Sequence, residues 1–590
     1  MGAGIARRHV TFFSHLFSVS PFFFPAKIMR LAQKILSCFF AFHCVTAFAN
    51  PATVYVNGDI LTMQGDSPQY VEALVVQNDK IMFAGDKVQA LAQAGANPTL
   101  YDLNGRTLMP GFIDSWGHFA LIAQNTLGVN VGYFAQHPPQ TKAQVIQKLL
   151  TEGKLFNGWI MGSGYSEAML SDGGLSLADL DKAFPDQPLL IQNISTLTGL
   201  VNSAGLKKLA ITPATKAVGG FILKDPKTGE LTGELVGSPF MDAVVRAVGT
   251  YSQDITFDTY RKAEHVYLSN GFTTAQSYEA TIDDMNKMRM AIEQKVISVD
   301  LIALPAFDVV DEILKTKPNF QFGAYNQGDR GFKVAGMMVA TDGAPQLRFA
   351  YFTKPFLDTT GFSADWRGFP FTPQSTVDHY AKLAYEKNIQ YFGYSNGDAG
   401  IDMALSALTK AMKETGVTED RRPVISHSFF VREDQLAQYK DKKIMAITLP
   451  NHIWLYGDVY LKILGEERAK NISPLRSADK LGVKIGIHND TPSSGPNVLF
   501  SVWSAVNRKT FSGKTLGEEQ RIDVYKALQG FTVNAAYQYK EEMSKGMLTK
   551  GMLADLVELD RNPLKVDADD IKNIRVVQTI KHGKQLYRAQ

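Results

Sequence analysis

Apolar and polar positions follow two different patterns along this chain. Between residues 52 and 109, short apolar runs such as 73–77 and 80–85 are separated by turn residues, which predicts the strands of a small β-sandwich. From residue 256 onward, apolar runs that end in polar residues alternate with stretches of helical spacing. This alternation predicts a parallel sheet covered by helices, and a closed (β/α)8 barrel suits the length of 590 residues.

Each strand predicted in the second region is apolar and is followed by polar side chains. These strands are 332–341, 389–394, 423–426, 444–449 and 483–487. Between two of them, Ile401, Leu405 and Leu408 repeat at helical spacing, and Gly416 predicts the end of that helix. In a parallel barrel, polar residues at the carboxyl ends of the strands meet in one pocket. We therefore expect the functional site at these positions.

The first 49 residues differ from the rest of the chain. They contain five basic residues and no acidic one. Arg30 and Lys34 precede a short apolar run, 35–45, and the small residues of Ala47-Phe48-Ala49 follow, which is typical of a secretory signal peptide that starts at Met1 or at Met29. The run is shorter than the ~20 apolar residues that a membrane span needs; an amino-terminal membrane anchor is the alternative interpretation.

Removing the signal segment changes the chemistry expected of the mature chain. Its five positive charges account for the change in formal net charge from +3 to −2, so no basic surface for nucleic acid is indicated. Both cysteines, Cys38 and Cys44, lie in this segment, so we expect no disulfide or thiol chemistry in the mature protein. The mature protein is expected to be secreted or periplasmic, without stable membrane association.

The segment Pro110–Phe119 carries the most specific motif. After the apolar run Leu108–Ile113 it reads Asp114-Ser-Trp116-Gly-His118. It resembles the signature that opens the barrel in the amidohydrolase superfamily, in particular its YtcJ-like branch (amidohydrolase family 3). Members of that branch act on carbon–nitrogen bonds with a metal-activated water. The branch has Asp-x-His-x-His here, so Trp116 stands where the first metal-binding histidine is expected.

The resemblance covers nearly all of the chain after the signal segment and implies an architecture. It implies an α/β fold with a TIM-like (β/α)8 barrel over residues 110–540, interrupted by an inserted subdomain at about 121–248. It also implies that residues 50–109 and 541–590, which both contain strand-like segments, form one composite β-sandwich.

Two further strand ends keep the frame of the branch but lose its metal ligands. Where the branch has Lys-x-x-x-Asp-Gly, this chain begins with Met338 and keeps Asp342. Methionine cannot be carboxylated, and its thioether is a poor ligand for hard divalent ions. Where the branch has His-x-Asn-Gly-Asp, this chain begins with Tyr394 and keeps Asp398. In the insertion, Leu197 replaces a further histidine of the branch.

Several positions of the family site survive. The candidate metal ligands are His118, His427 and Asp490, and the resemblance makes Asp490 the catalytic aspartate. The candidate substrate-binding residues are Trp116, Met338, Tyr394 and His452. Each residue also has a structural interpretation, because a lone histidine at a strand end is usually a hydrogen-bonded structural residue and aspartates cap helices or form turns.

Two functions are open. The resemblance implies a hydrolase that acts on a non-peptide carbon–nitrogen bond of a small molecule, with a reduced site that holds at most one weakly bound zinc or other divalent ion. Two histidines and a carboxylate, with water, can suffice for zinc. The alternative is a metal-free pseudoenzyme that serves as a ligand-binding or regulatory protein, since the branch also includes a regulator of exoenzymes. The expected partner is a small-molecule ligand, and a homo-oligomer is open.

The signal segment gives a first prediction. We expect the exported protein to begin near Asn50, because the basic residues, the apolar run and the small residues before Asn50 match the three parts of a signal peptide. Amino-terminal sequencing of the exported protein measures this. A mature chain that still carries Met29 would contradict cleavage.

Overall fold

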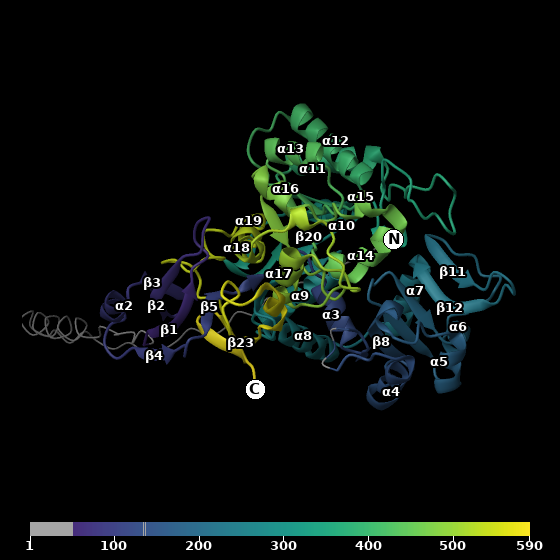
Figure 1. Cartoon of the computed structure of the whole chain (residues 1–590), viewed down its shortest axis with the longest axis horizontal. Helices are drawn as coiled ribbons and strands as arrows, with labels where there is room; N and C mark the ends of the chain where they lie inside the picture. The colour runs from purple at the N-terminus through teal and green to yellow at the C-terminus, as the bar shows by residue number, and fades with distance from the viewer. Residues whose placement is uncertain (1–50, 134, 136) are drawn as a thin grey trace, which may run out of the picture. The chain divides into compact units, whose positions relative to one another are not determined.

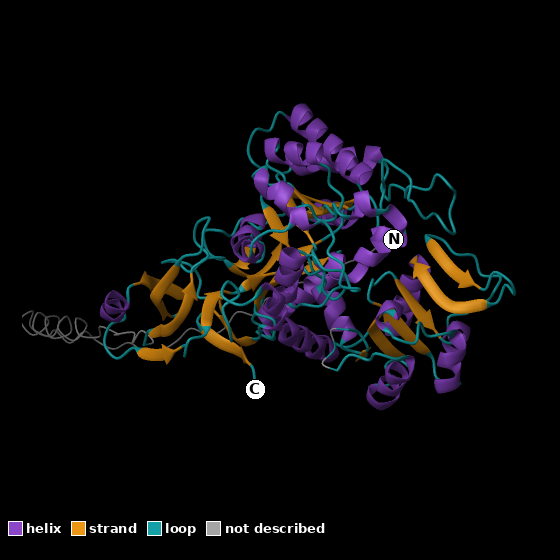
Figure 2. Ribbon diagram, viewed as in Figure 1, coloured by secondary structure: helices purple, strands orange, loops and turns teal. Residues whose placement is uncertain are grey.

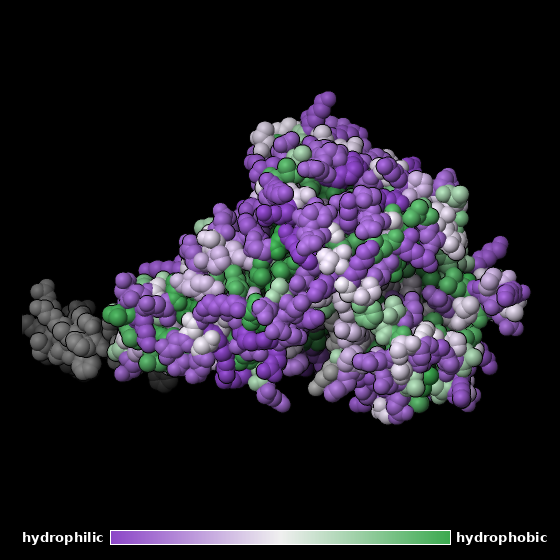
Figure 3. All heavy atoms as spheres, in the orientation of Figure 1, coloured by the Kyte–Doolittle hydropathy of each residue, from purple (hydrophilic) through white to green (hydrophobic). Residues whose placement is uncertain are grey.

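The computed structural model describes residues 51–590 except 134 and 136, and residues 51–590 form one compact unit (Figure 1). The predicted signal peptide lies outside the described residues. Within residues 51–590, no helix combines the length and the apolar character that crossing a membrane requires. Hydrophilic side chains predominate on the face drawn in Figure 3, with apolar ones scattered among them.

Strands from both ends of the chain form one eight-stranded sheet. Its order is β24-β23-β22-β5-β1-β2-β3, and β4 pairs with β1. The strands are β1 Thr53–Leu61, β2 Tyr70–Gln77, β3 Lys80–Gly85, β4 Thr99–Asp102, β5 Thr107–Pro110, β22 Leu556–Leu559, β23 Val576–Lys581 and β24 Lys584–Arg588, with helix α2 at Lys87–Gln93. Because β22 pairs antiparallel with β5, the C-terminal strands join the sheet next to the first barrel strand.

Parallel strands from the middle of the chain form two five-stranded sheets, whose strands are orange in Figure 2. Their orders are β15-β16-β14-β13-β6 and β17-β18-β19-β20-β21, and only β15 runs antiparallel to its neighbour. The strands are β6 Phe112–Ile113, β13 Phe272–Tyr278, β14 Asp300–Leu304, β15 Tyr325–Gln327, β16 Arg330–Val334, β17 Gly336–Ala340, β18 Gln390–Ser395, β19 Val424–His427, β20 Met445–Thr448 and β21 Ile485–Ile487.

The two sheets follow one another as in a barrel, which confirms the predicted α/β class. Strands β16 and β17 are separated only by Ala335, whose N–H donates to Ala303 at 2.9 Å. At the other junction, β6 and β21 do not pair directly within the described chain. The N–H of Ile113 donates to the carbonyl of Phe531, and the N–H of Ile487 donates to that of Gly530. A loop segment therefore completes the ring in place of strand pairing.

Helices cover the parallel strands, as the alternation of patterns predicts. They are α3 Phe119–Asn125, α8 Gln253–Leu268, α9 Ile282–Glu293, α10 Phe307–Thr316, α11 Gln374–Glu386, α12 Asp398–Thr415, α13 Glu433–Asp441, α14 Asn451–Leu464, α15 Glu466–Ala469, α16 Leu475–Lys480, α17 Val498–Asn507, α18 Val524–Gln529 and α19 Val533–Gln538. Helix α12 buries Ile401, Leu405 and Leu408 and ends at Gly416, whose φ of 64° is left-handed. The predicted helix end is confirmed.

A separate six-stranded sheet lies within the predicted insertion. Its order is β11-β12-β10-β9-β8-β7. The strands are β7 Val129–Asn130, β8 Ile160–Tyr165, β9 Leu189–Asn193, β10 Thr198–Val201, β11 Gly220–Lys224 and β12 Leu231–Gly237, with helices α4 Lys142–Glu152, α5 Leu177–Ala183, α6 Ser203–Lys208 and α7 Ser238–Val248. This sheet has its own apolar core, which includes Trp159, Leu235 and Phe240.

Buried charges join the barrel to the eight-stranded sheet. Asp300, the first residue of β14, contacts Lys545 at 2.5 Å and Lys581 of β23 at 2.6 Å. Lys581 also contacts Asp555 at 2.7 Å, and Lys545 contacts Glu541 at 3.0 Å. Lys333 completes this ion network by pairing with Glu541. The network thus contains three lysines and three carboxylates, all buried.

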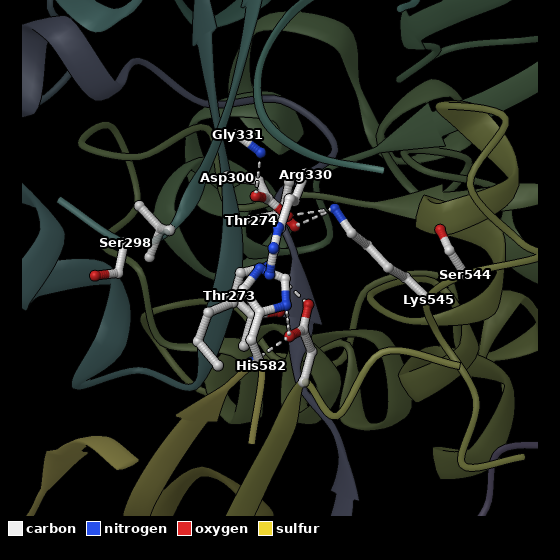
Figure 4. Close-up of polar contacts among 12 residues, drawn as sticks. Thr273, Thr274, Ser298, Asp300, Arg330, Gly331, Ser544, Lys545 and His582 are labelled. Carbon is white, nitrogen blue, oxygen red and sulfur yellow. Dashed lines mark hydrogen bonds and ion pairs between the residues drawn. The ribbon is translucent and has the colours of Figure 1, made fainter. Parts of the chain in front are cut away.

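Asp300 is the centre of the ion network (Figure 4). Its carboxylate also accepts a hydrogen bond from the N–H of Gly331 at 2.7 Å. Burial alone would raise the pKa of Asp300, but the charges of Lys545 and Lys581 hold that pKa below its usual range. Burial would likewise lower the pKa of Lys545, whereas Asp300 and Glu541 raise it well above its usual value. Both groups therefore stay ionised in a buried setting.

The ion network predicts a large loss of stability when one partner is removed. We expect Lys545→Met to lower the free energy of unfolding by roughly 3–5 kcal/mol, because Asp300 and Glu541 would lose a buried partner. Denaturant unfolding measures the change. Lys584→Met, which removes an exposed lysine of β24, is the matched control and should cost less than about 0.5 kcal/mol. Equal effects of the two substitutions would contradict a structural role of the network.

Candidate active site

A cavity of about 350 Å³ opens where the carboxyl ends of the barrel strands meet the inserted sheet. His118 follows β6, Tyr394 lies near the end of β18, His427 ends β19 and Asp490 follows β21. His452 reaches the same cavity from α14. Residues of β9 and α7, among them Gln192 and Val244, form the wall on the side of the insertion. The cavity thus lies where a parallel barrel places its chemistry.

His118 and Asp490 form a hydrogen-bonded pair in this cavity. The Nε2 atom of His118 lies 3.2 Å from Oδ1 of Asp490, across 372 residues of sequence. Their side chains are 16% and 14% exposed, so the pair is shielded yet reachable from the cavity. Asp490 has a φ of 52°, in the left-handed region that few non-glycine residues adopt, and residues in such conformations cluster at active sites.

The two members of the pair shift one another's pKa. Burial alone would lower the pKa of His118, but its hydrogen bond to Asp490 and the charges of Asp490 and Glu279 raise it above its usual value. Burial would raise the pKa of Asp490, whereas the same hydrogen bond and the nearby histidines hold that pKa far below its usual range. His118 is therefore a stronger base than a free imidazole, and Asp490 remains a carboxylate.

Three aromatic rings pack together beside this pair. Trp116 lies 4.6 Å from Tyr278 and 6.1 Å from Tyr394, measured between ring centroids. We call these three residues the aromatic wall. His427 packs against it, with its ring 4.4 Å from that of Tyr394, and burial lowers its pKa well below the usual value. Tyr394, which is partly exposed, thus provides apolar surface to the cavity, and the fully buried Trp116 packs behind it.

His452 lines the cavity in a neutral form. Its ring stacks on Phe429 with centroids 4.4 Å apart, and its Nδ1 lies 3.0 Å from the hydroxyl of Tyr460. Burial lowers the pKa of His452 to about 3. At neutral pH, His452 therefore offers hydrogen bonding without charge.

Met338 is buried in an apolar cluster together with Trp116 and Phe392, whereas Ala340 two residues later lines the cavity. Side chains two residues apart on a strand share a face, so Met338 lies on the same face of β17 as Ala340. Contact of Met338 with substrate stays a prediction.

Asp342 and Asp398 hold loops together. Asp342 is buried and accepts backbone N–H groups of Tyr351, Asn396 and Gly397, each at 2.8 Å, and burial raises its pKa to about 7. Asp398, in the first turn of α12, accepts the N–H of Thr353 at 2.8 Å. Their contacts therefore support a structural role for both residues.

Sequence reasoning missed several residues of the cavity, above all Tyr278 and Glu279. They stand at the end of β13, a buried but largely polar strand that was not among the strands predicted. The signal was weak, because only Phe272, Thr273, Thr274 and Tyr278 of this strand are strand formers. The Tyr278 hydroxyl donates to Oε1 of Glu279 at 3.0 Å.

The side chains do not fit a metal ion as the family binds it. Among residues 51–590, apart from the two that are not described, no group of three or more His, Cys, Asp and Glu side chains is placed to hold a metal. His118 is hydrogen-bonded to Asp490, and His427 packs among Tyr394, Phe429 and His488.

The position of the cavity at the strand ends agrees with the class of protein that comparison with known families identifies. The chain belongs to the amidohydrolase family, whose model matches residues 99–587. This confirms the resemblance carried by the motifs.

Individual relatives extend over almost the full chain. YtcJ of Bacillus subtilis is 24% identical over 553 residues, which cover 90% of this chain and 99% of that protein. The N-substituted formamide deformylase of Arthrobacter pascens is 21% identical over 561 residues, which cover 90% and 97%. An uncharacterized metal-dependent hydrolase from Pyrococcus horikoshii has a TM-score of 0.70 at 22% identity, covering 88% of this chain and 99% of that one. This last similarity concerns the fold.

The loss of ligands predicts low metal content. We expect the purified protein to bind no binuclear centre and at most one weakly held zinc, since even changes around a metal's ligands commonly cost 10–100-fold in affinity. Elemental analysis after zinc or manganese loading measures this. The triple variant Trp116→His, Met338→Lys and Tyr394→His restores the family residues and should increase uptake. Two tightly bound ions in the unmodified protein would contradict the prediction.

Proposed function

We propose that this protein hydrolyses a non-peptide carbon–nitrogen bond in a small molecule, and that the His118–Asp490 pair carries the reaction. The observation that supports this most is the pair itself, which is hydrogen-bonded, shielded and open to a cavity of about 350 Å³. Membership of the amidohydrolase family and similarity to a formamide deformylase support the choice of bond. We also propose that the mature protein acts outside the cytoplasm, on the strength of its signal segment.

The pair can perform general base and then general acid catalysis. Because Nε2 of His118 faces Asp490, the Nδ1 atom is left to take a proton from a water molecule. The water oxygen adds to the carbonyl carbon while the Asp490 carboxylate stabilises the imidazolium that forms. His118 then gives the proton to the departing nitrogen, and the carbon–nitrogen bond breaks to release an acid and an amine. No step in this scheme needs a metal ion.

A second candidate function is ligand binding without catalysis. It is supported by the aromatic wall, in which Trp116 and Tyr394 stand at family ligand positions and pack together instead of presenting imidazoles. A rebuilt cavity of this kind suits a binding or regulatory protein. In that case the protein would bind small molecules in the same cavity but release no amine from them.

The two candidates differ in their response to loss of the pair. We expect wild-type protein to release amine from members of a panel of N-substituted formamides and other acylated amines. Asp490→Asn and His118→Gln should each lower the rate by about 100-fold or more, because general acid–base catalysis contributes 10²–10⁴-fold. A fluorogenic assay for primary amines measures the rate, with chelator present in parallel samples.

The matched control is Asp523→Asn, which changes an exposed aspartate at the start of α18. It should leave the rate unchanged. Wild-type protein that binds the panel compounds without releasing amine would favour the second candidate. A rate that disappears on chelation would contradict the metal-free scheme.

A further inference from the structure

Glu279 and Asp284 are the two cavity carboxylates to which the described residues offer no ion pair. Asp490 is paired with His118. Asp284 accepts the Thr281 hydroxyl at 2.7 Å in the capping box of α9, and Lys287 is paired with Asp283 at 2.6 Å. Glu279 accepts only the hydroxyl of Tyr278, and no lysine or arginine of the described chain forms an ion pair with it.

The environment of Glu279 disfavours the charged form of its carboxylate. Glu279 is exposed where it lines the cavity, yet desolvation by the neighbouring protein raises its pKa, and the charge of His118 opposes that shift only in part. Its backbone has a φ of 51°, a left-handed conformation that is rarely adopted by glutamate. A strained residue that holds an unmatched carboxylate in a cavity is a candidate for ligand recognition.

The rings beside Glu279 suit the same kind of ligand. Tyr278, which bonds to Glu279, packs against both other members of the aromatic wall, 4.6 Å from Trp116 and 6.1 Å from Tyr394. Aromatic faces attract organic cations through the ring quadrupole, and more strongly when water is excluded. A carboxylate that is partly shielded from water by the neighbouring protein also attracts a cation more strongly than one in bulk water.

We propose that Glu279 and the aromatic wall recognise the positively charged amine group of a small organic ligand with an apolar body. Glu279 supplies the opposite charge and a hydrogen-bond acceptor. The partly exposed rings of Tyr278 and Tyr394 supply the surface for the adjoining carbon atoms, and the buried ring of Trp116 packs behind them. A metal ion is a poor alternative occupant, since a single carboxylate beside tyrosine and tryptophan lacks the convergent ligands that a metal needs.

This inference deepens the proposed function and rests on it in one respect, which is the relation between the recognised amine and the product of hydrolysis. Hydrolysis of an acylated amine releases an amine, which is protonated at neutral pH, so a site for a cationic amine would hold the product or a second amine on the substrate. Recognition itself does not depend on catalysis. It follows from the charge of Glu279 and from the neighbouring rings.

Calorimetry with three compounds that share one apolar body tests the proposal. The probes are 2-phenylethylamine, 2-phenylethanol and 3-phenylpropanoate at neutral pH. We expect wild-type protein to bind the amine about 10-fold or more tightly than the alcohol, as a hydrogen bond to a charged group provides, and to bind the carboxylate most weakly. Equal affinity for amine and alcohol, or tighter binding of the carboxylate, would overturn the proposal.

Variants locate the effect at Glu279. In Glu279→Gln, which keeps the size of the side chain, the preference for amine over alcohol should fall to about 2-fold or less. Glu293→Gln makes the same change at an exposed glutamate of α9 and should keep the full preference. A folded Glu279→Gln protein, judged by its unfolding midpoint, that retains the 10-fold preference would refute the assignment.

The hydrolysis variant separates this proposal from the proposed function. Asp490→Asn should retain the preference for the amine while it loses amine release. Protein that releases amine from its substrates but shows no preference among the probes would overturn the recognition proposal alone. Protein that shows the preference but hydrolyses none of the acylated amines would overturn the proposed function alone.

Discussion

The ion network around Asp300 is the interaction on which the arrangement of the chain depends most. It joins the amino end of β14 to Lys545, from the segment that follows α19, and to Lys581 of β23. The partners lie 245 and 281 residues apart, so the network forms only when barrel, C-terminal segment and eight-stranded sheet are all in place. Because unpaired buried charges are costly, every other packing of these segments is disfavoured.

The ion network and the cavity lie at opposite ends of the barrel strands. The network lies at the amino-terminal end of β14, whereas the cavity lies at the carboxyl ends of the strands, which is the end that barrels use for chemistry. Residues at the cavity end can then depart from relaxed geometry. His427, Asp490 and Glu279 all have positive φ angles, and their conformations are maintained by the structure below them.

The cavity combines the His118–Asp490 pair with the aromatic wall, and burial beside the rings affects which side chains are charged. Burial beside aromatic rings lowers the pKa of His427 and that of His452, so both stay neutral, whereas the pKa of His118 is raised. The hydrogen bond to Asp490 and the charge of Glu279 produce this increase in the pKa of His118. Burial beside these rings thus gives the remaining charged groups a setting in which their interactions are strong.

The sequence by itself determined the class of fold and the family. Periodicity sets local structure, as in α12 and its end at Gly416, and short motifs such as the one that ends at His118 carry a family resemblance without a structure. Only the tertiary structure decided how deep Met338 lies, which carboxylate faces the rings, and how Gly530 and Phe531 complete the ring of strands. The spacing of residues in the sequence indicates which side chains share a face of a helix or strand. How deeply a side chain is buried, and which residues it contacts, depend on segments hundreds of residues away.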